Sequence, residues 1–332
     1  MRGKSGVLDN SFLKFLLMSP QQQEILASYA TGTTVAGISQ KALRCIPISA
    51  PPFKEQIEIG LLLSALDDKI DLNRRMNETL EAMARAIFKD WFVDFGPTRA
   101  KMEGREPYLV PEIWELFPER LDGEGRPEGW VESSIGNEVD VVGGSTPSTK
   151  EAAFWNGDIN WATPKDLSSL QTPILLETSR RITPVGLAKI SSGLLPRGTV
   201  LLSSRAPIGY LAIAETEVAI NQGFIAMRCD KRLSNIFVWL WTLSNMNSVL
   251  ENANGSTFQE ISKKNFRPLP VIVPSSPIVT AFDETVRPLY KRIVGNEIES
   301  RTLAQLRDLL LPKLMSGEIR LREAEVRLKE AV

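Results

Sequence analysis

The sequence predicts a mixed α/β (α+β) fold, in which one full α/β domain is joined to two long helices that pair as an antiparallel coiled coil. Three observations lead to this prediction. The chain contains one long internal repeat, each copy of the repeat ends in a heptad pattern, and the segment between the heptads alternates short β-rich stretches with polar turns. The length of 332 residues, with 43% hydrophobic and 24% charged residues, indicates a globular protein of about two domains.

The two copies of the internal repeat align without gaps. Segment 32–92 matches segment 255–315 at 13 positions, among them Asn73 with Asn296 and Leu80 with Leu303. The interval between the copies is too long for a solenoid repeat, so we interpret it as a duplicated unit of domain end plus helix. Residues 10–31 resemble only the last helix of the later domain, so most of a first domain is expected to be missing.

Both copies carry one narrow apolar stripe with steps of three and four residues, at 57–92 and 278–314. Neither stripe can be buried alone, and each helix is the obvious partner of the other. Asn73 and Asn296 both lie on this stripe. An asparagine at such a position lowers the stability of a coiled coil but fixes its register and partner choice. Pro288 is expected to kink the second helix or to mark its first turn. The predicted pairing residues are Leu66, Ile70, Asn73, Leu80, Ile87, Leu289, Ile293, Asn296, Leu303 and Leu310.

Between the helices, residues 94–127 are rich in glycine and proline and indicate a connector with little regular structure. Strands are expected at Thr199–Ser204, Gly209–Ala214 and Gly223–Arg228, and a buried helix at Ile236–Leu243. The predicted segments are 1–50 (the end of a first domain), 51–93 (first long helix), 94–127 (connector), 128–273 (full domain), 274–317 (second long helix) and 318–332 (charged tail).

The composition excludes several kinds of chemistry. The chain has no histidine, which rules out a Ser-His-Asp triad, a Cys-His pair and a histidine metal ligand, and two cysteines cannot build the usual structural zinc site. No metal or cofactor is therefore expected. Two distant cysteines and the lack of a long apolar run indicate a cytoplasmic protein without a membrane span. The net charge of −1 gives no general affinity for nucleic acid, so any DNA contact must come from local patches.

The order of these segments resembles the specificity (S) subunit of type I restriction-modification systems. The resemblance covers nearly the whole chain, although the second domain–helix junction (Pro274–Pro277) lacks the Glu-Gln pair present at 55–56. The motifs that carry the resemblance are Gly143–Ser148, Phe154–Gly157, Ile159–Asp166, Asn221–Gly223, Gly255–Thr257 with Ile261-Ser262, Pro51–Gln56 and Leu306–Ile319.

The resemblance implies that 128–273 is a target recognition domain, the second of two, and that the chain is not an enzyme. It implies double-stranded DNA as a ligand, methyltransferase (M) subunits docked on the helices, and restriction (R) subunits bound through M. Adenine methylation and ATP-dependent DNA cleavage would then take place in those partners. No methyltransferase motif and no nucleotide-binding loop is found in the sequence.

Specific DNA binding requires hydrogen-bonding groups at base edges and cations near phosphates. Segment 128–273 has 13 basic and 13 acidic residues, so the position of each charge matters more than the total. Every candidate also has an ordinary explanation: a surface turn or solvated lysine, a strand-end ion pair at Arg205, or an asparagine that caps its own turn at Asn221. The candidates are Ser145, Thr146, Ser148, Lys150, Lys165, Ser204, Arg205, Asn221, Gln222, Thr257, Lys263 and Lys264.

Three alternatives remain open from the sequence. A half-type specificity protein would dimerise through its helices and so regain two recognition domains. A decoy subunit would occupy M subunits without productive DNA binding. A self-sufficient enzyme would need its own cluster of catalytic carboxylates.

Overall fold

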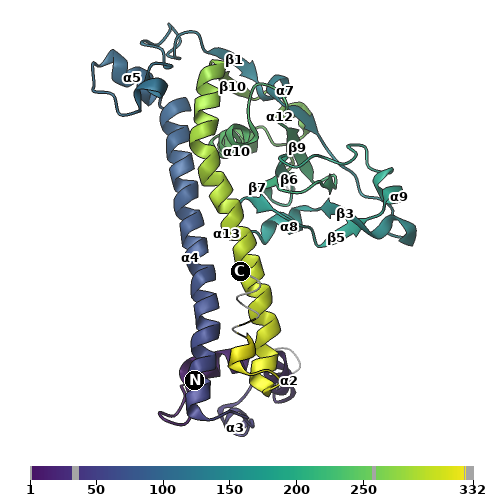
Figure 1. The fold of residues 1–332 in the computed structure, drawn as a ribbon. Coiled ribbons are helices and arrows are strands. Elements are labelled where there is room, and N and C mark those ends of the chain that lie inside the picture. Colours follow the sequence, from purple (N-terminus) through teal and green to yellow (C-terminus); the bar gives the residue numbers. More distant parts are fainter. Residues whose placement is uncertain (1, 32–36, 256–258, 325, 327–332) are drawn as a thin grey trace. The chain divides into compact units, whose positions relative to one another are not determined.

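The computed structural model describes residues 2–31, 37–255, 259–324 and 326. The chain divides into two compact units. The terminal unit consists of Met1–Met76 with Gly295–Val332, and the sheet unit of Asn77–Val294. The division cuts both long helices, so each unit holds one part of each helix (Figure 1).

Helices form the terminal unit within the described residues. It contains three short helices and parts of two long ones: α1 (Asn10–Met18), α2 (Pro20–Ser28), α3 (Gln40–Arg44), α4 (Phe53–Phe92) and α13 (Ser276–Ser316). Asp9 caps α1 by accepting hydrogen bonds from the backbone N–H groups of Ser11 and Phe12. Gln56, in the first turn of α4, donates to the carbonyls of Val7 and Pro51, and so joins the start of the long helix to the chain before α1.

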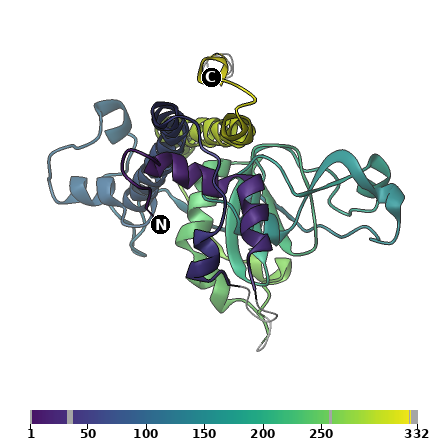
Figure 2. The same cartoon turned by 90° about the horizontal axis from the view of Figure 1, so that it is seen from below.

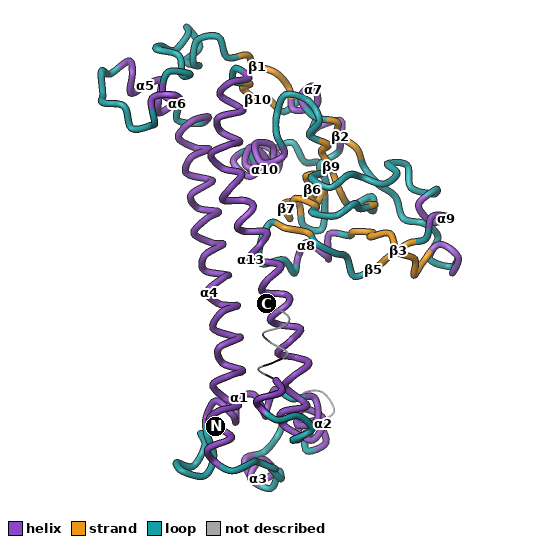
Figure 3. The backbone as a smooth tube through the Cα atoms, viewed as in Figure 1, coloured by secondary structure: helices purple, strands orange, loops and turns teal. Residues whose placement is uncertain are grey.

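The sheet unit carries all the strands that the structure describes, as Figure 3 shows. Its strands are β1 (Val131–Ser134), β2 (Asp140–Val142), β3 (Trp155–Ala162), β4 (Ile174–Leu175), β5 (Arg180–Ile182), β6 (Val200–Ser204), β7 (Ile208–Ala214), β8 (Ala219–Ile220), β9 (Phe224–Arg228) and β10 (Pro270–Val273). The central sheet has the order β2-β9-β6-β7-β4, and a smaller sheet has the order β5-β3-β8. The expected strands at 199–204, 209–214 and 223–228 are confirmed.

The helices of the sheet unit connect and cover these strands. They are α5 (Gly96–Met102), α6 (Pro111–Trp114), α7 (Ile135–Glu138), η1 (Ala152–Phe154), α8 (Pro164–Ser168), α9 (Pro184–Leu187), α10 (Asn235–Ser244), α11 (Met246–Glu251) and α12 (Lys263–Phe266). The predicted buried helix is α10, of which residues 236–242 are all buried. Three apolar clusters of described residues, one centred on α10, one on the inner strands and a smaller one around Trp155 and Trp161, form the core of the unit.

Helices α4 and α13 pair in opposite directions, as the fold class predicts; Figure 2 views them along their axes. In the terminal unit, Asn73 of α4 contacts Asn296 and Glu299 of α13, and Asp67 pairs with Arg307 at 2.8 Å. Residue numbers therefore fall along α4 as they rise along α13. In the sheet unit, the Phe88 and Phe92 rings of α4 pack against the Phe282 ring of α13, with centroids 5.9 and 4.9 Å apart.

Two expectations need correction. Helix α13 begins at Ser276, so Pro288 does not mark its first turn; buried Phe282, Val286, Tyr290 and Ile293 hold the helix together on both sides of the proline. The connector 94–127 contains α5 and α6, since a proline stands in the first turn of each helix, where its missing N–H costs nothing. Buried Trp114 and Phe117 anchor this segment to the core.

The duplication extends to local structure. The alignment of the two copies carries α3 onto 263–267, where α12 lies, and α4 onto 276–315, where α13 lies. The same alignment carries the isolated bridge between Thr31 and Gly37 onto the one between Asn254 and Glu260. No described helix is long and apolar enough to cross a membrane.

Candidate nucleic-acid interface

Loops from several parts of the sheet unit meet through direct contacts, and they carry most of the predicted DNA-contact residues. The loop that follows β2 joins the turn between β8 and β9, because Thr146 Oγ1 donates to Gln222 Oε1 at 2.6 Å and the Ser145 N–H donates to the Ile220 carbonyl at 3.1 Å. A Cβ at Gly144 would stand 1.8 Å from the Ile220 oxygen, so only glycine allows this approach.

The end of β6 belongs to the same group of loops. Ser204 is 2% exposed, its N–H donates to the Gly223 carbonyl, and its carbonyl accepts from the Ile261 N–H. Ser204 therefore holds neighbouring segments together and does not itself face solvent. The next residue, Arg205, is partly exposed and forms the strand-end ion pair that was one of its two interpretations, with Glu260 at 3.6 Å.

Asn221 and Gln222 differ in which of their side-chain donors and acceptors remain available to a ligand. Asn221 Oδ1 accepts from the Gly223 N–H at 2.9 Å, so this oxygen closes the turn. Gly223 also meets the turn before α8, because a Cβ there would lie 2.9 Å from Pro164 Cγ. Gln222 is exposed, and its amide oxygen is already used by Thr146, which leaves its NH₂ group as the donor for a ligand. Thr146 thus orients the side chain best suited to contact a base acceptor.

Four lysines of this face lack acidic partners among the described residues. Lys150, Lys165, Lys263 and Lys264 are exposed, and none has an ion-pair partner within the described residues. Lys263 reaches the loop after β2, since a Cβ built at Gly143 would lie 3.2 Å from Lys263 Nζ. Ser148 is exposed next to Lys150. Thr257 lies outside the described residues.

Three arginines elsewhere in the same domain are paired. Arg197, Arg228 and Arg232 bind Glu215, Asp140 and Glu138, respectively. The balance of 13 basic and 13 acidic residues therefore does not exclude a local basic patch, because four lysines without acidic partners among the described residues lie on these loops. Such a surface suits phosphates, while Gln222 offers a hydrogen-bond donor to a base.

Asp166 positions Lys165. Its Oδ2 accepts from the Thr163 N–H at 2.7 Å and its Oδ1 from the Ser179 N–H at 2.8 Å, which closes a capping box at the start of α8. Burial by itself would raise the pKa of Asp166, but the hydrogen bonds from Ser179 and Thr163 outweigh it and lower the pKa. The carboxylate therefore stays ionised and keeps the turn before Lys165 rigid.

The predicted helix-pairing residues lie along the two long helices. Leu66, Asn73, Ile293, Asn296, Leu303 and Leu310 are buried, whereas Ile70, Leu80, Ile87 and Leu289 are half-buried. Asn73 donates to the Asn296 carbonyl, Glu299 and Ser300. In the sheet unit, Phe88 and Phe92 take more of the burial than Ile87, because α10 packs there and widens the apolar face beyond one heptad stripe.

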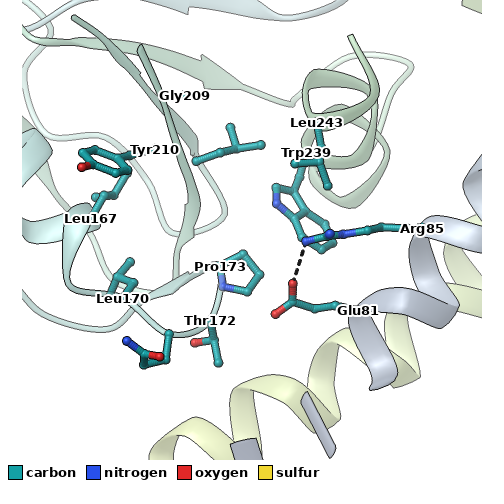
Figure 4. A pocket seen from close by; sticks show the side chains of 12 residues that line it. Glu81, Arg85, Leu167, Leu170, Thr172, Pro173, Gly209, Tyr210, Trp239 and Leu243 are labelled. Atoms are coloured by element: carbon teal, nitrogen blue, oxygen red, sulfur yellow. Dashed lines mark hydrogen bonds and ion pairs between the residues drawn. The ribbon is translucent and has the colours of Figure 1, made fainter. Parts of the chain in front are cut away.

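A pocket of about 230 Å³ opens between α4 and the sheet domain, inside the sheet unit (Figure 4). Tyr210, Trp239 and Leu243 line it together with Glu81, which pairs with Arg85 at 3.0 Å. Burial raises the pKa of the Glu81 carboxyl despite Arg85. No predicted DNA-contact residue lines this pocket, and its carboxylate does not suit a phosphate.

In the described part of the chain, no group of three or more Cys, Asp or Glu side chains is placed to hold a metal ion. Trp155, Trp161, Trp239 and Trp241 are at most 8% exposed and belong to the core.

Comparison with known proteins agrees with this architecture. The family model for the type I restriction modification DNA specificity domain matches residues 3–82 and 127–299, and the chain therefore belongs to this family.

Relatives match most of the chain. The HindI type I restriction enzyme specificity subunit of Haemophilus influenzae is 26% identical over 93% of this chain and 77% of its own length. The MjaIX specificity subunit of Methanocaldococcus jannaschii is 26% identical over 96% of this chain and 71% of its own length. The crystal structure of a type I restriction-modification S subunit from M. genitalium has a TM-score of 0.57 at 16% identity, covers 94% of this chain and 74% of that one, and shows the same fold.

Proposed function

We propose that this chain is the non-catalytic subunit that gives a type I restriction-modification complex its DNA sequence specificity. Family membership supports the general role. The observation that carries the proposal is the group of loops at 143–150, 163–165, 204–206, 220–223 and 260–264, which contact one another and present four lysines without acidic partners among the described residues.

Residues on this face divide into two kinds by their chemistry. Lys150, Lys165, Lys263 and Lys264 contact phosphates, which fixes the position of the domain on the duplex but carries little sequence information. Gln222, oriented by Thr146, contacts base edges, and its free NH₂ donor fits an acceptor in the major groove. Ser145, Ser148, Ser204 and Asn221 shape the loops, and Arg205 contacts DNA when it leaves Glu260.

The long helices dock the methyltransferase subunits, and restriction subunits bind through those. Exposed apolar side chains on the helices support this docking, because several such side chains on one surface mark an interaction site. In the terminal unit these are Leu61, Leu72, Ile298 and Leu309, each at least 47% exposed. Adenine methylation and ATP-dependent cleavage take place in the partner subunits.

The test is co-expression of this chain with the M subunit of its own system, followed by purification and DNA footprinting. We expect a stable complex that protects a defined sequence. A Gln222→Ala variant is expected to relax specificity, and Lys263→Ala to weaken binding to all sequences by a similar factor. Lys231→Ala is the control, because Lys231 donates to the Asn137 carbonyl away from the loops. The proposal fails if the two subunits never copurify and no footprint forms.

A half-type specificity subunit is the second candidate, and one observation favours it. In the terminal unit α1 packs on the helix pair as α10 does in the sheet unit, yet no described strand lies in that unit. A dimer of this chain would supply two sheet domains. Light scattering distinguishes the cases: a dimer supports the half-type form, and a monomer that lowers methylation when a full-length counterpart is co-expressed supports a decoy.

A further inference from the structure

A stacked arginine stands beside the candidate interface and is absent from the predicted DNA-contact residues. The guanidinium of Arg180, the first residue of β5, lies 3.7 Å from the Trp155 ring centroid and 5.3 Å from that of Trp161. Arg180 is exposed, and its guanidinium has no acidic partner among the described residues. Contact with the two buried indoles restricts the guanidinium, and no hydrogen bond to another described residue uses its N–H groups.

The same two tryptophans hold the hydroxyl-rich loop in place. Trp155 Nε1 donates to the Ser148 carbonyl at 3.0 Å, and Trp161 Nε1 donates to the Ser145 carbonyl at 3.3 Å. The two indoles are 5.0 Å apart in an edge-to-face arrangement. Arg180 and the loop 145–148 are therefore built on one rigid aromatic support.

The backbone of Arg180 is fixed as well. Arg180 is the register partner of Trp161 in the antiparallel pair β3–β5, and Thr178 Oγ1 donates to the Arg180 carbonyl at 2.7 Å. Side chains alternate between the two faces of a strand, so Arg180 and Ile182 share the tryptophan face while Arg181 points to the other. Arg181 has the same charge on the same strand and is exposed, which makes it a matched control.

We propose that Arg180 contacts DNA in the same interface as the loop 145–148 and is already held in position for this contact. Two parallel N–H groups of its guanidinium bind a pair of acceptors on duplex DNA. Two kinds of acceptor have this geometry, guanine O6 with N7 and two phosphate oxygens. This inference deepens the proposed function and depends on it. A rigid arginine loses little side-chain entropy on binding, which is the physical advantage of stacking it beforehand.

The experiment uses the complex with the M subunit and a labelled duplex that carries the motif methylated by that complex. We expect Arg180→Ala to weaken binding about tenfold to a hundredfold, because one bidentate contact is lost. Arg180→Lys keeps the charge but lacks the fork, so we expect it to restore less than half of this loss on a logarithmic scale. Arg181→Ala should stay within about twofold of the unsubstituted complex, since a remote surface charge contributes little.

Salt titration then identifies the acceptor. If Arg180 contacts a phosphate, its loss reduces the steepness of log K (the binding constant) against log salt concentration by about one. If it contacts a guanine, the slope stays unchanged and the preference for one base pair is relaxed. The inference is overturned if the Arg180→Ala complex binds DNA within twofold of the unsubstituted complex, or no more weakly than the Arg181→Ala complex. If the unsubstituted complex itself binds no DNA, the proposed function fails instead.

Discussion

The two units attach a helix to the long helix pair at equivalent positions but with different side chains. In the terminal unit, Phe12 and Phe15 of α1 form a cluster with Ile59 and Leu63 of α4 and with Leu310, Leu311 and Leu314 of α13. In the sheet unit, Phe237 of α10 forms a cluster with Phe282 and Val286 of α13 and with Phe88 and Trp91 of α4. The alignment of the two copies of the repeat relates Ile59 to Phe282, Leu63 to Val286, Phe88 to Leu311 and Trp91 to Leu314.

Positions that the repeat makes equivalent thus lie on α4 in one unit and on α13 in the other. The duplicated sequence provides the same attachment twice, once aliphatic and once aromatic. Helix α10 is buried on every side because strands of the sheet also cover it, whereas α1 exposes Lys14 and Met18. The comparison teaches that packing of a short helix on the long pair does not require a sheet, since all the described strands, and the loops at 143–150 and 220–223, lie in the sheet unit.

The largest expected effect comes from the two attachment positions. Phe282 contacts four rings, those of Phe88, Trp91, Phe92 and Phe237, and Phe282→Ala should cost about 3–5 kcal/mol. Ile59→Ala should cost about 2–5 kcal/mol in the other unit. All seven tryptophans lie between Trp91 and Trp241, in the sheet unit. Tryptophan fluorescence during urea unfolding should therefore shift strongly for Phe282→Ala and less for Ile59→Ala, whereas circular dichroism detects both changes. Equal fluorescence shifts would contradict the division.

The next effect separates two adjacent glycines at the loop after β2. A Cβ at Gly144 would meet the backbone oxygen of Ile220 at 1.8 Å, so Gly144→Ala must move the loop and should cost about 1–3 kcal/mol together with DNA affinity. At Gly143 the added carbon meets only the flexible end of Lys263, at 3.2 Å, and Gly143→Ala should leave stability nearly unchanged. Equal losses in both variants would show that Gly144 does not set the loop.

Much of this fold is predictable from local pattern. Strands β6, β7 and β9, helix α10 and both long helices follow from periodicity, since burial of one face leaves a regular trace in the sequence. The connector helices were not predicted, because buried Trp114 stabilises this segment through distant contacts, and the pattern left open whether Pro288 kinks α13 or marks its first turn. Among the site residues, the contact between Thr146 and Gln222 joins segments 76 residues apart, which no local pattern reveals.

Arg180 shows the same limit. The sequence offered only an arginine two residues before an isoleucine, in a segment that lies beyond Trp155 and Trp161. The antiparallel register of β3 and β5 was needed to place that arginine on the indoles.

A pH-dependent effect tests how the turn before Lys165 is held. The folded-state pKa of Asp166 lies below its ordinary value of 3.8, so the native carboxylate binds fewer protons than the unfolded one. Its stabilisation is complete above the unfolded pKa and is lost as the pH falls through the folded pKa. Asp166→Asn should cost about 1–3 kcal/mol at pH 7. In urea titrations this cost should shrink as the pH falls below 3.8 and through the lower folded-state pKa. A difference that does not change with pH would contradict an ionised Asp166.

The smallest effect is a matched pair of caps at equivalent positions of the repeat. Ser39 Oγ accepts from the Ala42 N–H at 3.1 Å, and Ser262 Oγ accepts from the Asn265 N–H at 3.2 Å. Each Ser→Ala change should cost about 1 kcal/mol. Only Ser262→Ala should also weaken DNA binding, because it loosens the turn that carries Lys263. DNA binding lost equally in both variants would argue against a one-sided interface.

The central claim is that the loops of the sheet unit determine which DNA sequence partner subunits modify. The direct measurement is methylome sequencing of cells that carry the complete system, with this gene intact, deleted, or altered at Gln222 and Arg180. The account predicts one methylated motif that vanishes on deletion and becomes degenerate or weak in the loop variants. A motif that persists unchanged without the gene, or that is identical in the loop variants, would contradict it.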